Sequence, residues 1–367
     1  MPATAGIAQD RRRERKRKVS EAVENRTDRP GGDPGGAAPG PGAFGFVRMS
    51  GAAFLRQREA TVLVVTIALI IYFALASSNF LGKANLTTWL SQDAAPIIII
   101  AIGEVLLLIC GEIDLSVGFI YTFAAFLMHY LIDFYHVPGL LAILISLLMG
   151  LVVGWINAFL TVTVGLPSFI TTLGTGFVLL GLVNTTSHAQ PSPIPPAVEG
   201  VGHWIGSFGW SEISWAVALV ILFHIILTRT RWGLHTVAVG GNLLGAQEAG
   251  IKVKRIKYGN FMITGVLGAF VGLQVAFQTN TIDPTSGGYT PMFYAVTAAV
   301  IGGTAMLGGV GTILGAFLGA IVLATLTDGF SIIGISANPL DIIFGGAILI
   351  AMIANVQLAK LREAGRS

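Results

Sequence analysis

The sequence predicts an all-α integral membrane protein with about ten transmembrane helices and both termini in the cytoplasm. Of its 367 residues, 53% are hydrophobic and only 11% are charged, whereas a soluble domain carries about 25% charged residues. Most of the surface of this chain must therefore face an apolar medium, and the lipid bilayer is the medium that fits. Long uncharged stretches and an uneven distribution of basic residues point to the same class.

The uncharged stretches predict the spans, because a membrane-crossing helix needs about 20 apolar residues. Residues 60–82 carry no charge, and residues 134–198 and 284–327 contain no Asp, Glu, Lys or Arg. The two longer stretches must fold back on themselves at Gly- and Pro-rich breaks near residues 138–139, 165–167 and 308–309. We expect ten spans, at about residues 60–80, 93–110, 115–133, 139–161, 167–183, 212–229, 257–279, 291–308, 310–328 and 339–358.

The basic residues predict the orientation, because cytoplasmic segments carry an excess of Lys and Arg. Residues 1–58 hold 12 of the 22 Lys and Arg residues, and others cluster at 229–257 and 360–366. These segments are expected in the cytoplasm, with six spans before the central basic loop and four after it. The proline-rich segment 184–210, which has no Lys or Arg, is then external.

Three domains follow from this reading: a tail (1–58), a transmembrane domain (59–358) and a C-terminal cytoplasmic tail (359–367). The first tail combines a charge run at 11–18 with a Pro/Gly/Ala tract at 31–45. Such a composition buries too little apolar surface to offset its ordering entropy, so we expect disorder. The charge run either contacts anionic lipid head groups or only fixes orientation. Nucleic-acid binding is not expected, because it leaves the apolar bulk of the chain unexplained.

Small residues at helical spacing predict tight helix packing within the bundle. Glycines four residues apart let two helix backbones approach closely in lipid. The pairs that fit best are Gly150/Gly154, Gly268/Gly272 and Gly315/Gly319.

Two carboxylates, Glu112 and Asp114, lie between apolar runs in the segment 111–118. A charge near hydrocarbon costs several kcal/mol, so it is usually paired, solvated or functional. The segment is either a tight hairpin at the inner face or a break within the membrane. Asp114 and Ser116 either cap the following helix or line a solute path.

Two further segments are candidates for function. Residues 240–251 are helix-compatible between glycines and form either a docking element for a soluble partner or an ordinary connection. Residues 301–311 are Gly-rich but lack the Gly-Lys-Ser/Thr ending of a phosphate-binding loop, which occurs nowhere in the chain. We therefore expect a tight turn between two packed helices there, and ATP hydrolysis on a different protein.

The sequence offers no catalytic apparatus. No His, Asp or Glu cluster has metal-ligand spacing, no Ser-His-Asp set is arguable, and Cys110 is the single cysteine. We expect no enzyme activity, no metal and no cofactor.

Four motifs in order resemble the membrane subunits of ribose- and xylose-type bacterial ABC importers. Residues 111–118 match the family's Gly-Gly-Ile-Asp-Leu-Ser-Val-Gly, except that Glu112 replaces a glycine, and residues 167–175 resemble its Ile-Val-Thr-Leu-Gly-Thr element. In the cytoplasmic loop the matching residues are Gly241, Asn242, Ala246, Gly250 and Ile251, while Gly245 stands where an alanine is expected. Residues 301–311 are similar to the family's Gly-Gly-Thr…Gly-Gly-Gly turn. The resemblance covers residues 60–356.

The resemblance implies the permease subunit of an ATP-binding cassette importer in the bacterial cytoplasmic membrane, built from two similar halves. It implies three partners: a cytoplasmic ATP-binding subunit, an extracytoplasmic solute-binding protein and a second permease copy in a homodimer. The expected cargo is a monosaccharide or a related small polar solute. The five matching residues of the cytoplasmic loop would then couple the permease to the ATPase.

A hydroxyl-rich solute needs polar groups that replace its water. The residues that we assign to its path are Glu112, Asp114, Ser116, Asn157, Ser168, Thr171 and Thr172. For the last four, helix packing is an equal alternative. Glu112 either selects a polyol or an amine-bearing solute, or replaces a glycine at a solvated turn. The alternative function is a stand-alone secondary transporter or channel, whose ion relay would have to use Glu104, Glu112 and Asp114.

Overall fold

The computed structural model describes residues 58–334 and the isolated positions 342, 345–346, 349 and 353. The expected basic tail, apart from Arg58, lies outside the described residues. The same holds for the C-terminal tail (359–367) and for nearly all of the expected tenth span (339–358).

The described chain is built almost entirely of helices. The α-helices in order are α3 (Arg58–Ala76), α4 (Lys83–Thr87), α5 (Ala95–Ile109), α6 (Val117–Asp133), α7 (Gly139–Ala158), α8 (Ser168–Ser187), α9 (Glu199–Gly202), α10 (Ser211–Arg229), α11 (Arg231–Gly241), α12 (Leu243–Glu248), α13 (Val253–Thr279), α14 (Tyr289–Ile301) and α15 (Ile313–Ile332). Three segments are π-helical, η1 (Thr88–Ala94), η2 (Phe159–Val164) and η4 (His203–Ser207), and η3 (Pro196–Val198) is a 3₁₀ turn. Two short strands, β1 (Ser192–Pro193) and β2 (Thr281–Ile282), pair antiparallel.

Seven helical stretches in the described part of the chain are long and apolar enough to cross a membrane. Helices α6 and α14 are also apolar but shorter. Together these nine elements coincide with the first nine expected spans. The multi-helix membrane architecture is therefore confirmed for the described residues.

The second span begins earlier than predicted, at Lys83 instead of residue 93, because η1 joins α4 directly to α5. Pro96, in the first turn of α5, cannot donate a helical hydrogen bond, and its ring crowds the preceding turn. A π-helical turn placed just before the proline accommodates it without ending the helix.

The eighth span ends earlier than predicted, because α14 stops at Ile301 instead of residue 308. Gly303 has a positive φ of 86°, and the amides of Gly303 and Thr304 donate back to Val300 and Ala299. This pattern is the Schellman motif that closes a helix with a glycine. The chain then runs as a loop to Thr312, whose side chain caps α15 by accepting a hydrogen bond from Gly315 N–H.

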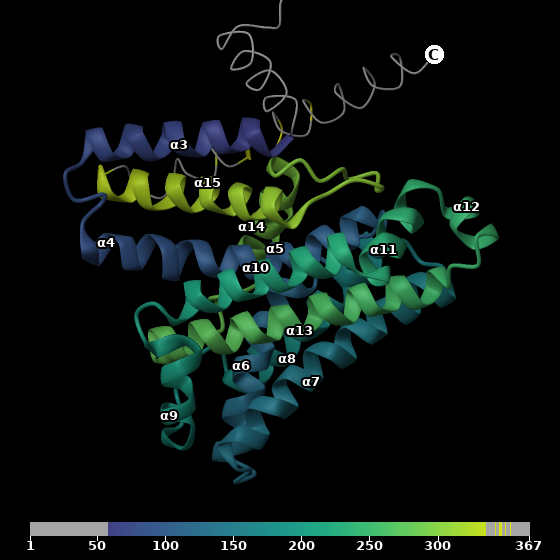
Figure 1. The fold of residues 1–367 in the computed structure, drawn as a ribbon. Helices are drawn as coiled ribbons and strands as arrows, with labels where there is room; N and C mark the ends of the chain where they lie inside the picture. Colours follow the sequence, from purple (N-terminus) through teal and green to yellow (C-terminus); the bar gives the residue numbers. More distant parts are fainter. Residues whose placement is uncertain (1–57, 335–341, 343–344, 347–348, 350–352, 354–367) are drawn as a thin grey trace, which may run out of the picture. The chain divides into compact units, whose positions relative to one another are not determined.

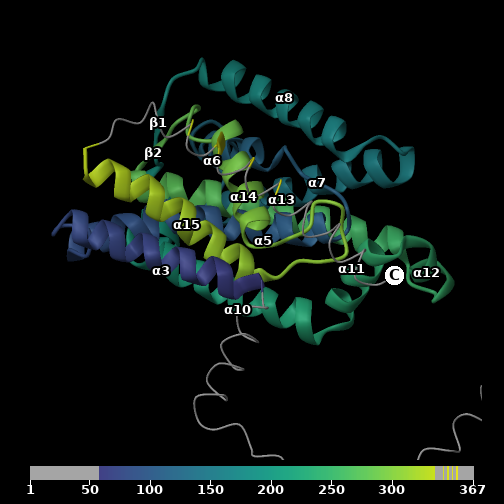
Figure 2. The same ribbon diagram turned by 90° about the horizontal axis from the view of Figure 1, so that it is seen from above.

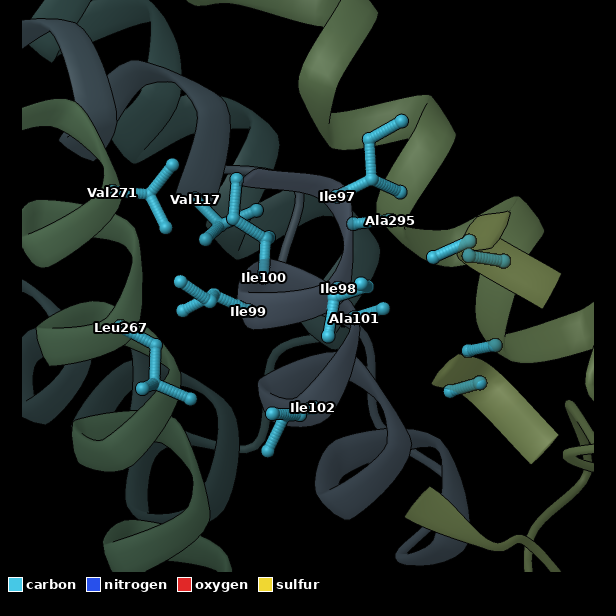
Figure 3. Close-up of a cluster of buried hydrophobic side chains, with 14 of the residues drawn as sticks. Ile97, Ile98, Ile99, Ile100, Ala101, Ile102, Val117, Leu267, Val271 and Ala295 are labelled. Atoms are coloured by element: carbon cyan, nitrogen blue, oxygen red, sulfur yellow. The ribbon is translucent and has the colours of Figure 1, made fainter. Parts of the chain in front are cut away.

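Helix α5 is the centre of the bundle. Every one of its residues except Pro96 is buried, as expected for a helix that is apolar on all sides. It packs against α10, α13, α14 and α15, and Figure 3 shows its isoleucines between Val117, Leu267 and Val271 on one side and Ala295 on the other.

The predicted glycine contacts are confirmed. A Cβ on Gly150 would lie 2.3 Å from the carbonyl oxygen of Gly265, so α7 and α13 meet backbone to backbone. A Cβ on Gly272 would lie 1.8 Å from the carbonyl oxygen of Tyr121 in α6. Gly319 approaches Ala298 in the same way, at 2.1 Å, which joins α15 to α14. The glycines therefore set the interhelical distances.

The outer helices leave large apolar faces uncovered. Helix α3 packs along α15 (Figure 1), and α8 lies at one edge beside α6 and α7 (Figure 2). Only 22% of the span in α3 and 28% of that in α8 is buried, against 89% for the span that contains α5. These outer faces suit contact with lipid or with another protein.

Candidate functional site

The segment between α5 and α6 is an irregular break inside the bundle. Gly111 has a φ of 73°, and the amides of Gly111 and Glu112 donate to Leu108 and Leu107 at 2.9 and 3.0 Å. This Schellman motif ends α5. Gly111 is exposed, whereas Asp114 and Ser116 are completely buried, so the segment runs from the surface into the bundle.

Asp114, which is fully buried, organises a polar network. Its Oδ1 accepts hydrogen bonds from the backbone N–H of Ser116 at 2.8 Å and from the Ser116 hydroxyl at 2.6 Å. Asn157 of α7 donates from Nδ2 to both carboxylate oxygens, each at 3.3 Å, and to Ser116 Oγ at 2.8 Å. Thr175 of α8 donates to Asn157 Oδ1 at 2.7 Å. The break is thereby fastened to two neighbouring helices.

The predicted α8 residues take different roles in this network. Thr172 Oγ1 accepts from Leu115 N–H at 2.9 Å and donates to the Ser168 carbonyl at 2.8 Å. Ser168 Oγ accepts from Ile113 N–H at 3.3 Å. Both hydroxyls thus satisfy backbone donors that the break leaves free. The Thr171 hydroxyl is buried and has no hydrogen-bond partner among the described residues.

The two acidic residues near this network differ. Glu112 forms an ion pair with Lys257 of α13, and both side chains are mostly buried. Glu104 of α5 is fully buried, and its Oε2 accepts from Asp114 N–H at 3.4 Å. The sequence placed Glu112 near the path but gave no partner for it. The ion pair with Lys257 connects the break to α13.

A second break, before α14, repeats the local geometry of the first. Asp283 Oδ1 accepts from Thr285 N–H at 2.7 Å and from the Thr285 hydroxyl at 2.8 Å, as Asp114 does from Ser116. The sequence signal is Ile-Asp-x-Ser/Thr, at 113–116 and again at 282–285. This repeat is visible in the sequence alone and is the signal that could have located the second break.

The helix that follows the first break touches the segment that leads into α14. Gly288 N–H donates to the Gly118 carbonyl at 2.8 Å. A Cβ on Gly118 would lie 2.0 Å from the Gly288 carbonyl oxygen, and one on Gly287 would lie 1.9 Å from Thr122 Oγ1. Only glycines allow this approach. It brings the first turn of α6 against the segment that leads into α14.

A cavity of about 340 Å³ lies where α6 and α8 meet the segment that leads into α14. Phe119 and Tyr289 pack edge to face in its wall, with ring centroids 5.2 Å apart. Its lining comes from α6, α8 and the α14 entry, namely Phe119, Thr122, Leu180, Val183, Asn184, Pro284, Thr285, Gly287, Gly288, Tyr289 and Thr290. The lining contains aromatic rings, hydroxyls and one amide but no charged side chain.

The predicted coupling segment forms the short helix α12. Asn242 caps it by accepting a hydrogen bond from Gly245 N–H at 2.9 Å, and Gly250 closes it with a φ of 80°. Ala246 is buried against Cys110, Val239 and Ile256, while Gly241 and Gly250 are exposed and Ile251 is half-buried. Leu243 and Leu244, which the sequence analysis did not single out, are 44% and 70% exposed at its tip.

The polar groups of the described residues form no metal centre. No three His, Cys, Asp or Glu side chains of the described residues come together as a metal site requires. The site is therefore one of hydrogen-bonding groups placed where helices of a membrane bundle begin and end, an arrangement that transport proteins use.

Comparisons with known proteins identify the family. Residues 85–353 match the family described as branched-chain amino acid transport system / permease component, and the chain belongs to that family. It is 34% identical to the xylose/arabinose import permease protein XylH of Sulfolobus acidocaldarius, over 82% of this chain and 85% of that protein. No solved structure matches it significantly.

Two further relatives have similar coverage. The probable ABC transporter permease protein YphD of Escherichia coli K12 is 33% identical over 82% of this chain and 90% of its own length. The autoinducer 2 import system permease protein LsrC of Photorhabdus luminescens is 29% identical over 82% and 91%. The chain is thus the permease subunit of an ABC importer, a multi-pass protein of the cytoplasmic membrane. Membership implies an ATP-binding subunit and a solute-binding protein as partners.

Proposed function

We propose that this permease imports a neutral, hydroxyl-rich small solute such as a monosaccharide, and that the solute contacts the cavity where α6 and α8 meet the segment that leads into α14. The uncharged lining of that cavity carries the proposal. Hydroxyls and an amide can replace the water around a sugar, and aromatic rings can pack on its C–H faces. A zwitterionic amino acid would leave two charges without partners there, which is costly.

The solute class is tested by a matched pair of substitutions on α8. Asn184→Leu removes the amide from the cavity, whereas Thr185→Val changes the exposed neighbour that does not line it. In proteoliposomes that contain the complete importer, Asn184→Leu should reduce pentose or hexose uptake at least tenfold, and Thr185→Val should leave it unchanged. Import of leucine but no sugar, or equal sugar uptake by both variants, would refute the proposed solute class.

We also propose that the permease works as a homodimer of two similar halves, with α12 seated on the ATP-binding subunit. The repeated Ile-Asp-x-Ser/Thr breaks support the two halves, because α6 and α14 are the shorter apolar helices and each follows one break. The exposed Leu243 and Leu244 support the seat, since their apolar side chains protrude at the tip of a small capped helix. The path assigned to Glu112, Asp114, Ser116, Asn157, Ser168, Thr171 and Thr172 then starts at the first break.

The seat of the ATP-binding subunit is tested at Leu244. Leu244→Asp places a carboxylate where the contact would bury it, so co-purification of the ATP-binding subunit and ATP-driven uptake should both be lost. Leu244→Met keeps the apolar contact and serves as the control. Since the side chain is 70% exposed, membrane insertion and thermal stability of the isolated permease should not change. Full uptake by Leu244→Asp would exclude α12 as the seat.

A further inference from the structure

Two cavities on the face formed by α10, α11 and α13 share a wall. One is an open apolar groove of about 600 Å³, lined by Leu151, Phe223, Ile226, Thr230, Trp232, Gly259, Met262, Ile263, Val266 and Leu267. The other has a volume of about 480 Å³ and is lined by Arg231, Trp232, His235, Ala249, Gly250, Ile251, Lys252, Arg255 and Ile256. Trp232 belongs to both, so the groove adjoins the second cavity.

The second cavity is basic and its charges are uncompensated. Arg231, Lys252 and Arg255 line it together with His235, and no acidic residue belongs to its lining. Among the described residues, none of these four side chains forms an ion pair. Arg231, Lys252 and Arg255 are exposed, so an anion can reach them.

The wall that α13 contributes runs from the basic cavity into the apolar groove. Arg255, Gly259, Ile263 and Leu267 follow one another at intervals of four residues, which places them on one face of the helix. The helix from Arg255 to Leu267 measures about 18 Å at 1.5 Å per residue. One leaflet of a hydrocarbon core about 30 Å thick measures about 15 Å. The stripe therefore has the length of one leaflet.

Trp232 holds the junction between the two cavities. Its Nε1 donates to Asn260 Oδ1 at 2.9 Å. Its ring lies over Gly259, where an added Cβ would be 2.2 Å from the ring carbons. The indole is thus held in one orientation. Its N–H edge is hydrogen-bonded, and its apolar ring forms part of the wall of each cavity. Tryptophan in this setting is typical of the membrane–water interface.

We propose that this surface binds one anionic phospholipid, with the phosphate among Arg231, His235, Lys252 and Arg255 and an acyl chain in the groove. Basic cavities between transmembrane helices recognise lipid phosphates by charge, and the adjoining groove, which follows α13 for about 12 Å from Gly259 to Leu267, adds apolar contact. An acidic segment of a partner protein would use the basic cavity but leave the groove empty. The lipid uses both, and the proposal does not depend on the transported solute.

Native mass spectrometry of the detergent-solubilised full chain tests the proposal with phosphatidylglycerol and phosphatidylethanolamine as probes. We expect one phosphatidylglycerol per chain to be retained in preference to phosphatidylethanolamine. The double variant Arg231→Gln/Arg255→Gln should weaken retention about 30-fold, because each Arg beside an anionic lipid contributes about a factor of five. The control Arg229→Gln/Lys254→Gln removes two neighbouring exposed cations outside the lining and should retain the lipid.

A second variant tests the groove. Val266→Phe narrows it far from the charges, so it should reduce retention of long-chain phosphatidylglycerol more than that of the dihexanoyl form. Millimolar inorganic phosphate should not displace the long-chain lipid. Equal retention of both lipid classes, an unaffected double variant, or full displacement by phosphate would overturn the proposal. Loss of the co-purified ATP-binding subunit in the double variant, with lipid retention intact, would assign the basic cavity to the partner protein and overturn it as well.

Discussion

At the scale of single residues, the first break is held by side chains that satisfy backbone donors. Helix ends inside a membrane bundle have no water to take over these bonds. Asp114, Thr172 and Ser168 accept from the N–H groups of Ser116, Leu115 and Ile113. The sequence left helix capping and lining of a path as alternatives for Asp114 and Ser116. Ser116 occupies the N-cap position of α6 without a capping bond from its side chain, and Asp114 accepts from the N–H of Ser116. Neither residue lines the cavity, so a place in the path stays a prediction.

Thr171 and Thr172 give a matched test of this bonding. Both are buried, but only Thr172 binds a backbone donor. Thr172→Val should lower the free energy of unfolding by about 1–3 kcal/mol, because it leaves Leu115 N–H without an acceptor. Thr171→Val removes a hydroxyl without a partner among the described residues and should be neutral or stabilising. Thermal unfolding in detergent measures both, and equal losses would contradict the assigned bond.

The ion pair between Glu112 and Lys257 predicts a coupling that exposed pairs lack. Exposed pairs contribute up to about 1 kcal/mol, whereas these side chains are only 13% and 15% exposed. A double-mutant cycle with Glu112→Gln and Lys257→Met should give a coupling free energy above that value. Unfolding of the four proteins in detergent supplies the data. Additive effects would mean that Glu112 acts independently of Lys257, as a residue of the solute path alone.

At the scale of elements, the sequence predicted which segments are helical better than where they end. The length of an uncharged stretch was sufficient to predict helices α3, α7, α10 and α13. It failed at α14, where the apolar residues continue past Ile301 but Gly303 reverses the backbone. It also missed α11, because Arg231–Gly241 mixes polar and apolar residues on a helix outside the membrane spans. Hydropathy reports burial in lipid, whereas helix ends depend on local backbone geometry.

Glycine substitutions separate packed helix faces from open ones. Gly150→Ala would place a methyl group 2.3 Å from the backbone of α13 and should destabilise the permease by about 1–3 kcal/mol or prevent folding. Gly181→Ala meets open space on α8 and should be neutral or stabilise by up to about 1 kcal/mol through helix propensity. Size-exclusion profiles and unfolding temperatures compare the two. A more damaging Gly181 variant would indicate that another chain covers that face.

At the scale of the whole molecule, the distribution of Lys and Arg predicts that α12 is cytoplasmic and that residues 184–210 are external. Single cysteines test this on a Cys110→Ala background. Leu244→Cys should react with an impermeant maleimide only after cell lysis, and Gln190→Cys should react in intact cells. Both positions are exposed, so access to the reagent depends on sidedness. The reverse pattern would invert the topology and displace the ATP-binding subunit from α12.

The sequence could predict only some of the residues that come together at the site. Asp114 and Ser116 were picked out by a motif and Asn157 as a polar residue of a predicted span, and the fold does bring the three together. Neither signal pointed to Asn184 or Thr290, which share the cavity although they lie far apart in the chain. Pairing of distant segments depends on how α6, α8 and α14 pack, and no local pattern encodes that. The second Ile-Asp-x-Thr segment shows that an internal comparison of the chain would have recovered part of it.

The hydrogen bond between Gly288 and Gly118 has an evolutionary consequence. It joins main-chain atoms, so exchange of a side chain elsewhere cannot delete it, provided that both glycines stay. The backbone of Gly288, which belongs to the cavity lining, is therefore held by main-chain geometry, while Asn184 and Thr290 elsewhere in the lining take no part in this bond and can be exchanged without breaking it. A new cargo preference can then arise by a few exchanges at such positions, without a change in the main-chain contact between α6 and the segment before α14.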